Sequence, residues 1–203
     1  MSVLLASGIR YVRDGRAILD DVSLWAPPGA VTAVIGPSGS GKSSLLAILA
    51  GLEQPDAGTV TNPFEASRTA LILQAYGLVS LLTASENVEM ALQADAGLSR
   101  RRIRRRAAAA LAEVGLEPVA DHLTEALSGG QQQRVAIARA LVVAPRLLIA
   151  DEFTAELDPV SRGRVDGMVR GLARGGATVV IATHDPAIAA AADHVLDLGA
   201  PSA

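Results

Sequence analysis

Short apolar runs alternate with segments of helical pattern along most of the chain, and several of these runs end in polar residues. This alternation is typical of an α/β fold with a largely parallel sheet. The expected strands cover residues 31–35, 70–73, 147–150 and 178–182. Ligands of open parallel sheets bind beyond the carboxyl ends of the strands, so the polar residues that follow these runs are the first candidates for a site.

One long segment, residues 77–127, has no strand pattern and is rich in Ala and Leu, with helix-start signals at Ser85 and Ser99. We expect it to form a helical subdomain inserted into a core made of residues 1–76 and 128–203. The whole chain, residues 1–203, is then a single domain. Asp158 and Asp185 each precede a proline, which predicts an N-cap followed by the first helical residue.

Composition narrows the classes of protein that fit. Half of the 203 residues are hydrophobic and 2% are aromatic, so Ala, Val, Leu and Ile must build the core, and we also expect the single Trp25 there. The net charge of -3 and a pI near 5.6 disfavour nucleic acid as a partner. No apolar stretch approaches the ~18 residues that cross a bilayer, so we expect a cytoplasmic protein without direct membrane insertion.

The most specific motif has the spacing G-x-x-x-x-G-K-S and contains Lys42, the single lysine of the chain. We call residues 36–43 the glycine loop; its members are Gly36, Pro37, Ser38, Gly39, Ser40, Gly41, Lys42 and Ser43. It lies between an expected strand and an expected helix, where backbone N–H groups and a helix N-terminus point at an anion. A flexible glycine-serine turn would need none of this context. The loop therefore predicts nucleotide phosphate binding.

Polar residues follow the other expected strands: Gln74, Asp151 with Glu152, and His184. If the strands are neighbours, these side chains meet Lys42 at one edge of the sheet. A carboxylate pair at a strand end is often solvated or paired with arginine, and a histidine there is often structural. Opposite a phosphate-binding loop, we favour catalysis for the carboxylates and a functional role for His184.

A second glycine-containing motif starts a predicted helix. Its residues are Leu127, Ser128, Gly129, Gly130 and Gln131, and an amphipathic run over 132–143 follows them. Serine and two glycines at a helix N-terminus can form another anion site. Alone, they would be read as an ordinary helix entry; in a chain with the glycine loop, we favour the anion site.

Together, the glycine loop, Gln74, residues 127–131, Asp151 with Glu152, and His184 resemble the ATP-binding cassette (ABC) ATPases, in the family's order along nearly the whole chain. The segment 76–88 is most similar to the subfamily that serves lipoprotein-release and macrolide exporters. The resemblance implies a P-loop NTPase fold whose parallel core carries the inserted helical subdomain and an antiparallel N-terminal β region. One departure is Phe153, where the family usually has proline.

The resemblance implies a role for each matched residue, with ATP and Mg²⁺ as cofactors. Lys42, Ser44 and the loop amides would hold the phosphates, and Ser43 and Asp151 would bind Mg²⁺, directly or through water. Gln74 would contact Mg²⁺ or the attacking water, as a metal ligand or a catalytic residue. Glu152 would be the general base, and His184 would contact the γ-phosphate. Tyr11 would stack on adenine, although a strand-packing role is a close alternative.

The family also implies that two chains sandwich two ATP molecules. Ser128, Gly130 and Gln131 would face the nucleotide of the opposite subunit, and Asp158 would lie near the dimer interface. The partners would be a second ATPase subunit, identical or different, and integral membrane permease subunits. The chain would then be peripheral at the inner face of the cell membrane.

Three other functions stay open from the sequence. The first is a non-transport ABC ATPase of the division-associated type, which these motifs do not exclude. A nucleotide kinase would leave Ser128 and the carboxylate pair unexplained. A non-hydrolysing ATP switch would not need Glu152 and His184.

The strongest charge run is Arg100, Arg101, Arg102, Ile103, Arg104, Arg105 and Arg106. Cations at the start of a helix oppose its macrodipole, so helix stability does not explain them. The simplest interpretation is a solvated face of the helical subdomain. The alternative is attraction to anionic lipid headgroups or to an acidic loop of a partner.

Overall fold

The computed structural model describes residues 3–73, 76–93, 95 and 97–199. The chain divides into two compact units. The first contains Met1–Leu71, Arg146–Glu152 and Arg170–Ala203, and the second contains Ile72–Pro145 and Phe153–Val169. The segment 77–127 lies within the second unit, which also takes in residues on either side of it.

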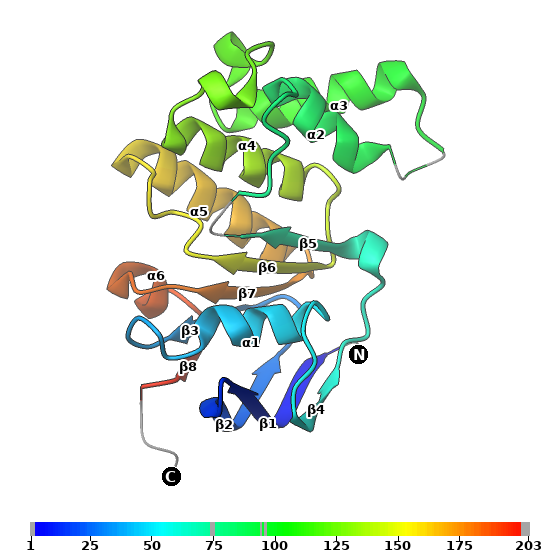
Figure 1. Ribbon diagram of the computed structural model, residues 1–203. Helices are drawn as coiled ribbons and strands as arrows, with labels where there is room; N and C mark the ends of the chain where they lie inside the picture. Colours follow the sequence, from blue (N-terminus) through cyan, green and yellow to red (C-terminus); the bar gives the residue numbers. More distant parts are fainter. Residues whose placement is uncertain (1–2, 74–75, 94, 96, 200–203) are drawn as a thin grey trace. The chain divides into compact units, whose positions relative to one another are not determined.

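A five-stranded sheet carries the four strands expected from the sequence (Figure 1). Its order is β5 (Thr69–Ile72), β6 (Leu147–Asp151), β7 (Thr178–Ala182), β3 (Val31–Ile35) and β8 (His194–Asp197). Val34 and Asp151 both pair with Ala182, from opposite sides of β7. Because the pairings are parallel, β3 and β6 end at the same edge of the sheet. The predicted α/β fold with a parallel core is confirmed.

A three-stranded antiparallel sheet in the order β2 (Arg16–Ala26), β1 (Leu4–Arg13) and β4 (Ala57–Thr61) confirms the predicted N-terminal β region. Its buried face shares one core with helix α1 (Lys42–Leu49) and with strands β3, β6 and β7. Leu45 and Leu49 of α1 are fully buried there, and each such side chain contributes about 1.5–3 kcal/mol to folding. This packing fixes the helix that follows the glycine loop.

The expectation that Trp25 lies in the core is wrong. Its relative exposure is 53%, and its ring meets the His194 ring edge-on at 4.9 Å. Leu24 and Ala26, on either side of it in β2, are buried. Since successive side chains of a strand point to opposite faces, Trp25 must point out.

The second unit contains helices α2 (Ala84–Leu92), α3 (Arg100–Glu113) and α4 (Gly129–Leu141), with 3-10 turns at Glu117–Val119 and Thr124–Ala126. Helix α2 starts at Ala84 because Thr83, not the predicted Ser85, caps it in a reciprocal pair with Glu86. Ser99 is the N-cap residue of α3 as expected, but its side chain makes no capping bond.

The two helix starts predicted at Asp158-Pro159 and Asp185-Pro186 are confirmed. Asp158 Oδ1 accepts hydrogen bonds from the N–H groups of Val160 and Ser161, both at 3.0 Å, at the start of α5 (Pro159–Arg174). Asp185 Oδ1 accepts the N–H of Ala187 at 2.8 Å at the start of α6 (Pro186–Ala190). Within the described ranges, the structure contains no helix with both the length and the apolar character needed to cross a membrane.

Candidate functional site

The glycine loop joins β3 to α1, as predicted, and it depends on glycine at two positions. Gly36 has φ 146° and Gly41, the N-cap of α1, has φ 95°, values that side-chain-bearing residues rarely adopt. A Cβ on Gly41 would also lie 2.7 Å from Cδ2 of Leu19 and 3.0 Å from the carbonyl oxygen of Ile18. The left-handed backbone and the close approach of β2 together favour glycine at position 41.

Lys42 lies folded against the loop that contains it. Its Nζ donates to the carbonyl oxygens of Gly36 at 2.9 Å and of Pro37 at 3.1 Å, and the residue is 9% exposed. Nearby, Ser40 Oγ is buried and has no hydrogen-bond partner within the described part of the chain. The loop thus holds an ammonium without a carboxylate partner among the described residues, together with an unused hydroxyl.

Asp151 and Glu152 follow one another at the end of β6 but face different surroundings. Asp151 is 6% exposed, and its Oδ1 atom is buried with no hydrogen-bond partner among the residues that the structure describes. Glu152 has a left-handed backbone, φ 49°, and its N–H donates to the carbonyl oxygen of Ala182 at 3.0 Å. The change of backbone conformation turns Glu152 out of the strand alternation.

Glu152 is held by His184, which follows β7. The Nδ1 atom of His184 lies 2.6 Å from Oε2 of Glu152, and the side chains are 72% and 18% exposed. His184 also lines a cavity of about 490 Å³ with Gly36 and Pro37 of the glycine loop. The structure therefore brings the loop, Glu152 and His184 to one edge of the sheet. Gln74 lies outside the described residues.

The motif 127–131 is built as a capped helix start. Ser128 is the N-cap of α4: its Oγ accepts the N–H of Gln131 at 3.4 Å, and Oε1 of Gln131 accepts the N–H of Ser128 at 2.9 Å. Leu127 before it is buried. The segment of Glu156 packs on both glycines. A Cβ on Gly130 would lie 2.8 Å from the carbonyl oxygen of Glu156, so glycine is required there, whereas a Cβ on Gly129 would meet the end of the Glu156 side chain, which a rotation can move away.

Sequence reasoning missed the contacts of Glu156. Its carboxylate accepts a hydrogen bond from the Tyr76 hydroxyl, and burial together with this carboxylate raises the pKa of Tyr76 to about 12. Arg139 of α4 donates to the carbonyl oxygens of Tyr76 at 2.8 Å and Gly77 at 2.6 Å. The glycine pair at 129 and 130 signalled a close approach, but nothing in the sequence pointed to Glu156 as the group that approaches.

Two other predicted residues have clear local contacts. Tyr11 is 5% exposed, and the Arg13 guanidinium carbon lies 3.7 Å from the centre of its ring. Stacking of Tyr11 on adenine stays a prediction, and it requires Arg13 to move. Asp158 caps α5, and its hydrogen bonds from Ser161 lower the pKa of its carboxyl group.

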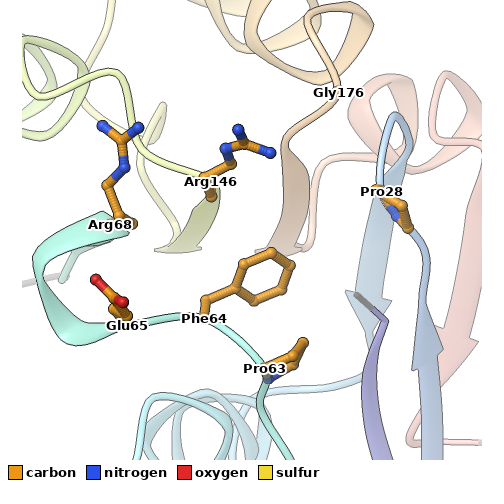
Figure 2. Close-up of a pocket in the computed structure, with 7 residues that line it drawn as sticks. All are labelled: Pro28, Pro63, Phe64, Glu65, Arg68, Arg146 and Gly176. Carbon is orange, nitrogen blue, oxygen red and sulfur yellow. The ribbon is translucent and has the colours of Figure 1, made fainter. Parts of the chain in front are cut away.

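A second cavity of the first unit, about 410 Å³, lies away from the predicted residues (Figure 2). Its lining comes mostly from segments just before β3, β5, β6 and β7, namely Pro28, Pro63, Phe64, Glu65, Arg68, Arg146 and Gly176. It therefore belongs to the amino-terminal edge of the sheet, opposite the glycine loop. The glycine loop, Glu152 and His184 lie at the carboxyl edge instead.

Comparison with known proteins agrees with this arrangement. The sequence profile described as ABC transporter matches residues 19–155, which include the glycine loop, the 127–131 motif and the carboxylate pair. The chain belongs to the ABC transporter family. The cassette is similar to two curated ABC proteins. An uncharacterised ABC transporter ATP-binding protein of Mycobacterium bovis is 39% identical over 206 residues, covering 94% of this chain and 62% of that protein. The macrolide export ATP-binding/permease protein MacB of Salmonella choleraesuis is 40% identical over 196 residues, covering 90% of this chain and 30% of that protein.

The ABC cassette spans 62% of the length of the first of these relatives. Among solved structures, it is similar to the dimeric bacterial ABC transporter cassette MJ0796, with a TM-score of 0.89 and 32% identity over 97% of this chain and 94% of that one. A post-hydrolysis state of MJ0796 bound to ADP and Pi matches with a TM-score of 0.88 and 32% identity, over the same shares of the two chains. These likenesses confirm the P-loop NTPase fold class.

Proposed function

We propose that the chain is the ATP-hydrolysing subunit of a membrane ABC transport complex, which binds MgATP, dimerises, hydrolyses ATP and opens. The observation that carries the proposal is the 2.6 Å contact between His184 and Glu152 beside a cavity shared with the glycine loop. A phosphate-binding loop, a carboxylate and its orienting histidine at one sheet edge are the parts that attack of water on a phosphoryl group needs.

The triphosphate of ATP binds in the glycine loop. Backbone N–H groups of residues 38–44 and the N-terminus of α1 surround the phosphates, with Ser44 in the first turn. Lys42 leaves the carbonyl oxygens of Gly36 and Pro37 and donates to phosphate oxygens instead. Because those backbone bonds hold the ammonium inside the loop, little reorganisation is needed for the exchange.

The residues at this edge fit a bound Mg²⁺. The cation takes oxygen ligands, and Asp151 Oδ1 is a buried carboxylate oxygen without a partner in the described part of the chain. Ser43 supplies a hydroxyl in the first turn of α1. Gln74, outside the described residues, stays a sequence-based candidate for a further oxygen ligand. When bound, Mg²⁺ neutralises charge on the phosphate oxygens.

Glu152 accepts the proton of the attacking water. The bond to His184 Nδ1 fixes the rotamer of the carboxylate. The Nε2 atom of His184, on a side chain that is 72% exposed, is then free to meet the γ-phosphate. His184 thus orients the base and contacts the substrate.

A second copy or a related subunit completes the site. Ser128, Gly130 and Gln131, at the start of α4, meet the γ-phosphate of the nucleotide held by the partner subunit, and Asp158 lies near that interface. The dimeric form of the similar MJ0796 cassette supports this assembly.

Permease subunits bind the second unit. Exposed apolar side chains lie on α2 and on the loops beside it: Val79 at 40%, Leu81 at 74%, Met90 at 38% and Leu123 at 41%. Thr83 forms a β-bridge with Leu123. The buried side-chain amide of Asn87 accepts the N–H of Val79 and donates to the Val79 carbonyl oxygen, so these contacts hold the loops in place. The ATP-binding/permease name of MacB supports this partner class. The chain is then cytoplasmic and peripheral at the membrane.

Nucleotide-dependent dimerisation tests the proposal. Glu152→Gln in saturating MgATP should bind nucleotide and shift from the 20.8 kDa monomer toward twice that mass by light scattering. The matched variant Lys42→Ala should stay monomeric, because it loses its phosphate contact. A Glu152→Gln chain that binds no nucleotide and stays monomeric would contradict the proposal.

A further inference from the structure

Helix α3 presents an array of arginines that the nucleotide chemistry does not use. We call it the arginine face; it consists of Arg100, Arg101, Arg102, Arg104 and Arg105, all exposed. Arg106 is excluded because it is half-buried and donates to the carbonyl oxygen of Val142 at 2.7 Å. Ile103 and Ala107 on the opposite side are buried and hold the helix in the second unit.

The arginine face works against its own helix. The first turn of α3 has no acidic residue, its last turn has no basic residue, and it ends at Glu113. Positive charge at the N-terminus and negative charge at the C-terminus both oppose the macrodipole. Nor does Ser99 compensate with a side-chain cap. Local stability therefore gives no reason for these arginines.

Acidic side chains also do not neutralise these charges in the part of the chain that the structure describes. Among the described residues, the arginine face makes no ion pair with Asp or Glu. The whole chain carries a net charge of -3 although residues 100–106 alone contribute six arginines. Positive charge is thus concentrated on one short helical segment of an otherwise acidic protein, which is the pattern of a surface for an external anion.

The shape of the arginine face favours a flat, negatively charged surface as its partner over a pocket on another protein. Arg100, Arg101 and Arg102 are consecutive, and at about 3.6 residues per turn their side chains spread over a broad arc. The rest of the exposed side of α3 is Ala108, Ala109, Ala112 and Glu113. It offers none of the aromatic or large apolar anchors that centre protein interfaces. Spread guanidinium groups without an anchor fit phosphodiester headgroups.

We propose that the arginine face binds the anionic phospholipid surface of a membrane directly. A basic residue near such a surface contributes about 1 kcal/mol, so loss of four should weaken binding by about 100-fold or more. The attraction acts over about a Debye length, ~10 Å at 0.1 M salt, so it should fall as salt rises. It adds a lipid contact to the contact made through permease subunits, and it requires neither ATP nor hydrolysis.

Vesicle co-sedimentation of the full chain, without nucleotide or permease, tests the proposal. The variant Arg100→Gln/Arg101→Gln/Arg104→Gln/Arg105→Gln removes four charges but keeps good helix formers. A control variant loses four exposed arginines that lie outside α3 and has the same net charge: Arg16→Gln/Arg68→Gln/Arg146→Gln/Arg174→Gln. Thermal melting verifies that both variants are folded.

The wild type and the control should bind vesicles that contain phosphatidylglycerol, and neither should bind phosphatidylcholine alone. The face variant should bind the anionic vesicles at least about 100-fold more weakly than the control. Equal binding by the face variant and the control would overturn the proposal, as would absence of wild-type binding to anionic vesicles. Binding to polyglutamate or to a DNA duplex that is tighter than binding to the vesicles would also overturn it, in favour of an acidic polypeptide or a nucleic acid.

Discussion

His184 and Glu152 lie at the ends of adjacent parallel strands, and their side chains meet at 2.6 Å although 31 positions separate them in sequence. Ala182, two residues before His184, accepts the backbone N–H of Glu152 at 3.0 Å. A backbone bond and a side-chain bond thus fix the carboxylate from the same strand end. This doubly held Glu152 is the geometric basis of the proposed hydrolysis.

The contact predicts that His184→Ala loses turnover while it keeps ATP binding. Glu152 would lose its orienting partner, and misplacement of a catalytic group by about 1 Å can cost 10²-fold. We expect a fall in kcat of about 10-fold to 100-fold, measured as phosphate release. His194→Ala is the matched control, since His194 touches Trp25 instead, and it should hydrolyse ATP like the wild type. Equal turnover of the two variants would exclude the role given to His184.

The packing of Glu156 predicts opposite effects of one substitution at two helical glycines. A Cβ at Gly130 would lie 2.8 Å from the backbone oxygen of Glu156, so Gly130→Ala should destabilise the protein by about 1–3 kcal/mol. Gly167 in α5 has no atom within 4 Å of an added Cβ, and Gly167→Ala should stabilise by about 0.5–1 kcal/mol. Urea unfolding measures both. If Gly130→Ala proved as stable as Gly167→Ala, the close approach of Glu156 would be refuted.

The Tyr76–Glu156 hydrogen bond predicts an alkaline loss of stability. The pKa of Tyr76 is about 12 in the folded protein and 10.0 for an unperturbed tyrosine, so its contribution to stability is complete below pH 10 and declines as pH rises toward 12. The free energy of unfolding should therefore fall less steeply between pH 10 and 12 in Tyr76→Phe than in the wild type. Parallel curves for the two proteins would contradict the assigned bond.

The charges at the two ends of α3 oppose its macrodipole, which predicts that Glu at its start would stabilise the helix more than Arg does. Arg100→Glu should stabilise the protein by about 0.3–1 kcal/mol, because an acidic side chain suits a helix N-terminus. Arg174→Glu, in the last turn of α5, should destabilise by a similar amount. Thermal unfolding at low salt measures both shifts. Shifts of the same sign would show that net charge, rather than helix polarity, decides the result.

Sequence pattern was sufficient for the features that depend on strand order. Buried strands with polar ends predicted the parallel sheet. Because parallel strands end at the same edge, this also predicted that Asp151 and His184 lie at one edge. The glycine loop was predictable because its positive φ angles admit few residues other than glycine. A loop of this kind can be predicted because its motif consists of consecutive residues.

Other features depend on contacts between distant segments or on which face a side chain takes. Trp25 was expected in the core because it is large and apolar, yet strand alternation turns it outward. Arg13 covers the Tyr11 ring, two residues away on the same strand, and composition does not predict that. Glu156 meets Tyr76 and Gly129 across long sequence separations, so only the folded chain reveals that cluster.

The most direct test of the central claim is steady-state phosphate release from MgATP by the wild type and by Glu152→Gln, with ATP affinity measured on the same samples. The wild type should turn over, and Glu152→Gln should be slower by about 10²–10⁴-fold at unchanged ATP affinity, because the proposed base is lost while the phosphate contacts stay. Near-wild-type turnover by Glu152→Gln, or a wild type that binds ATP without releasing phosphate, would contradict the account.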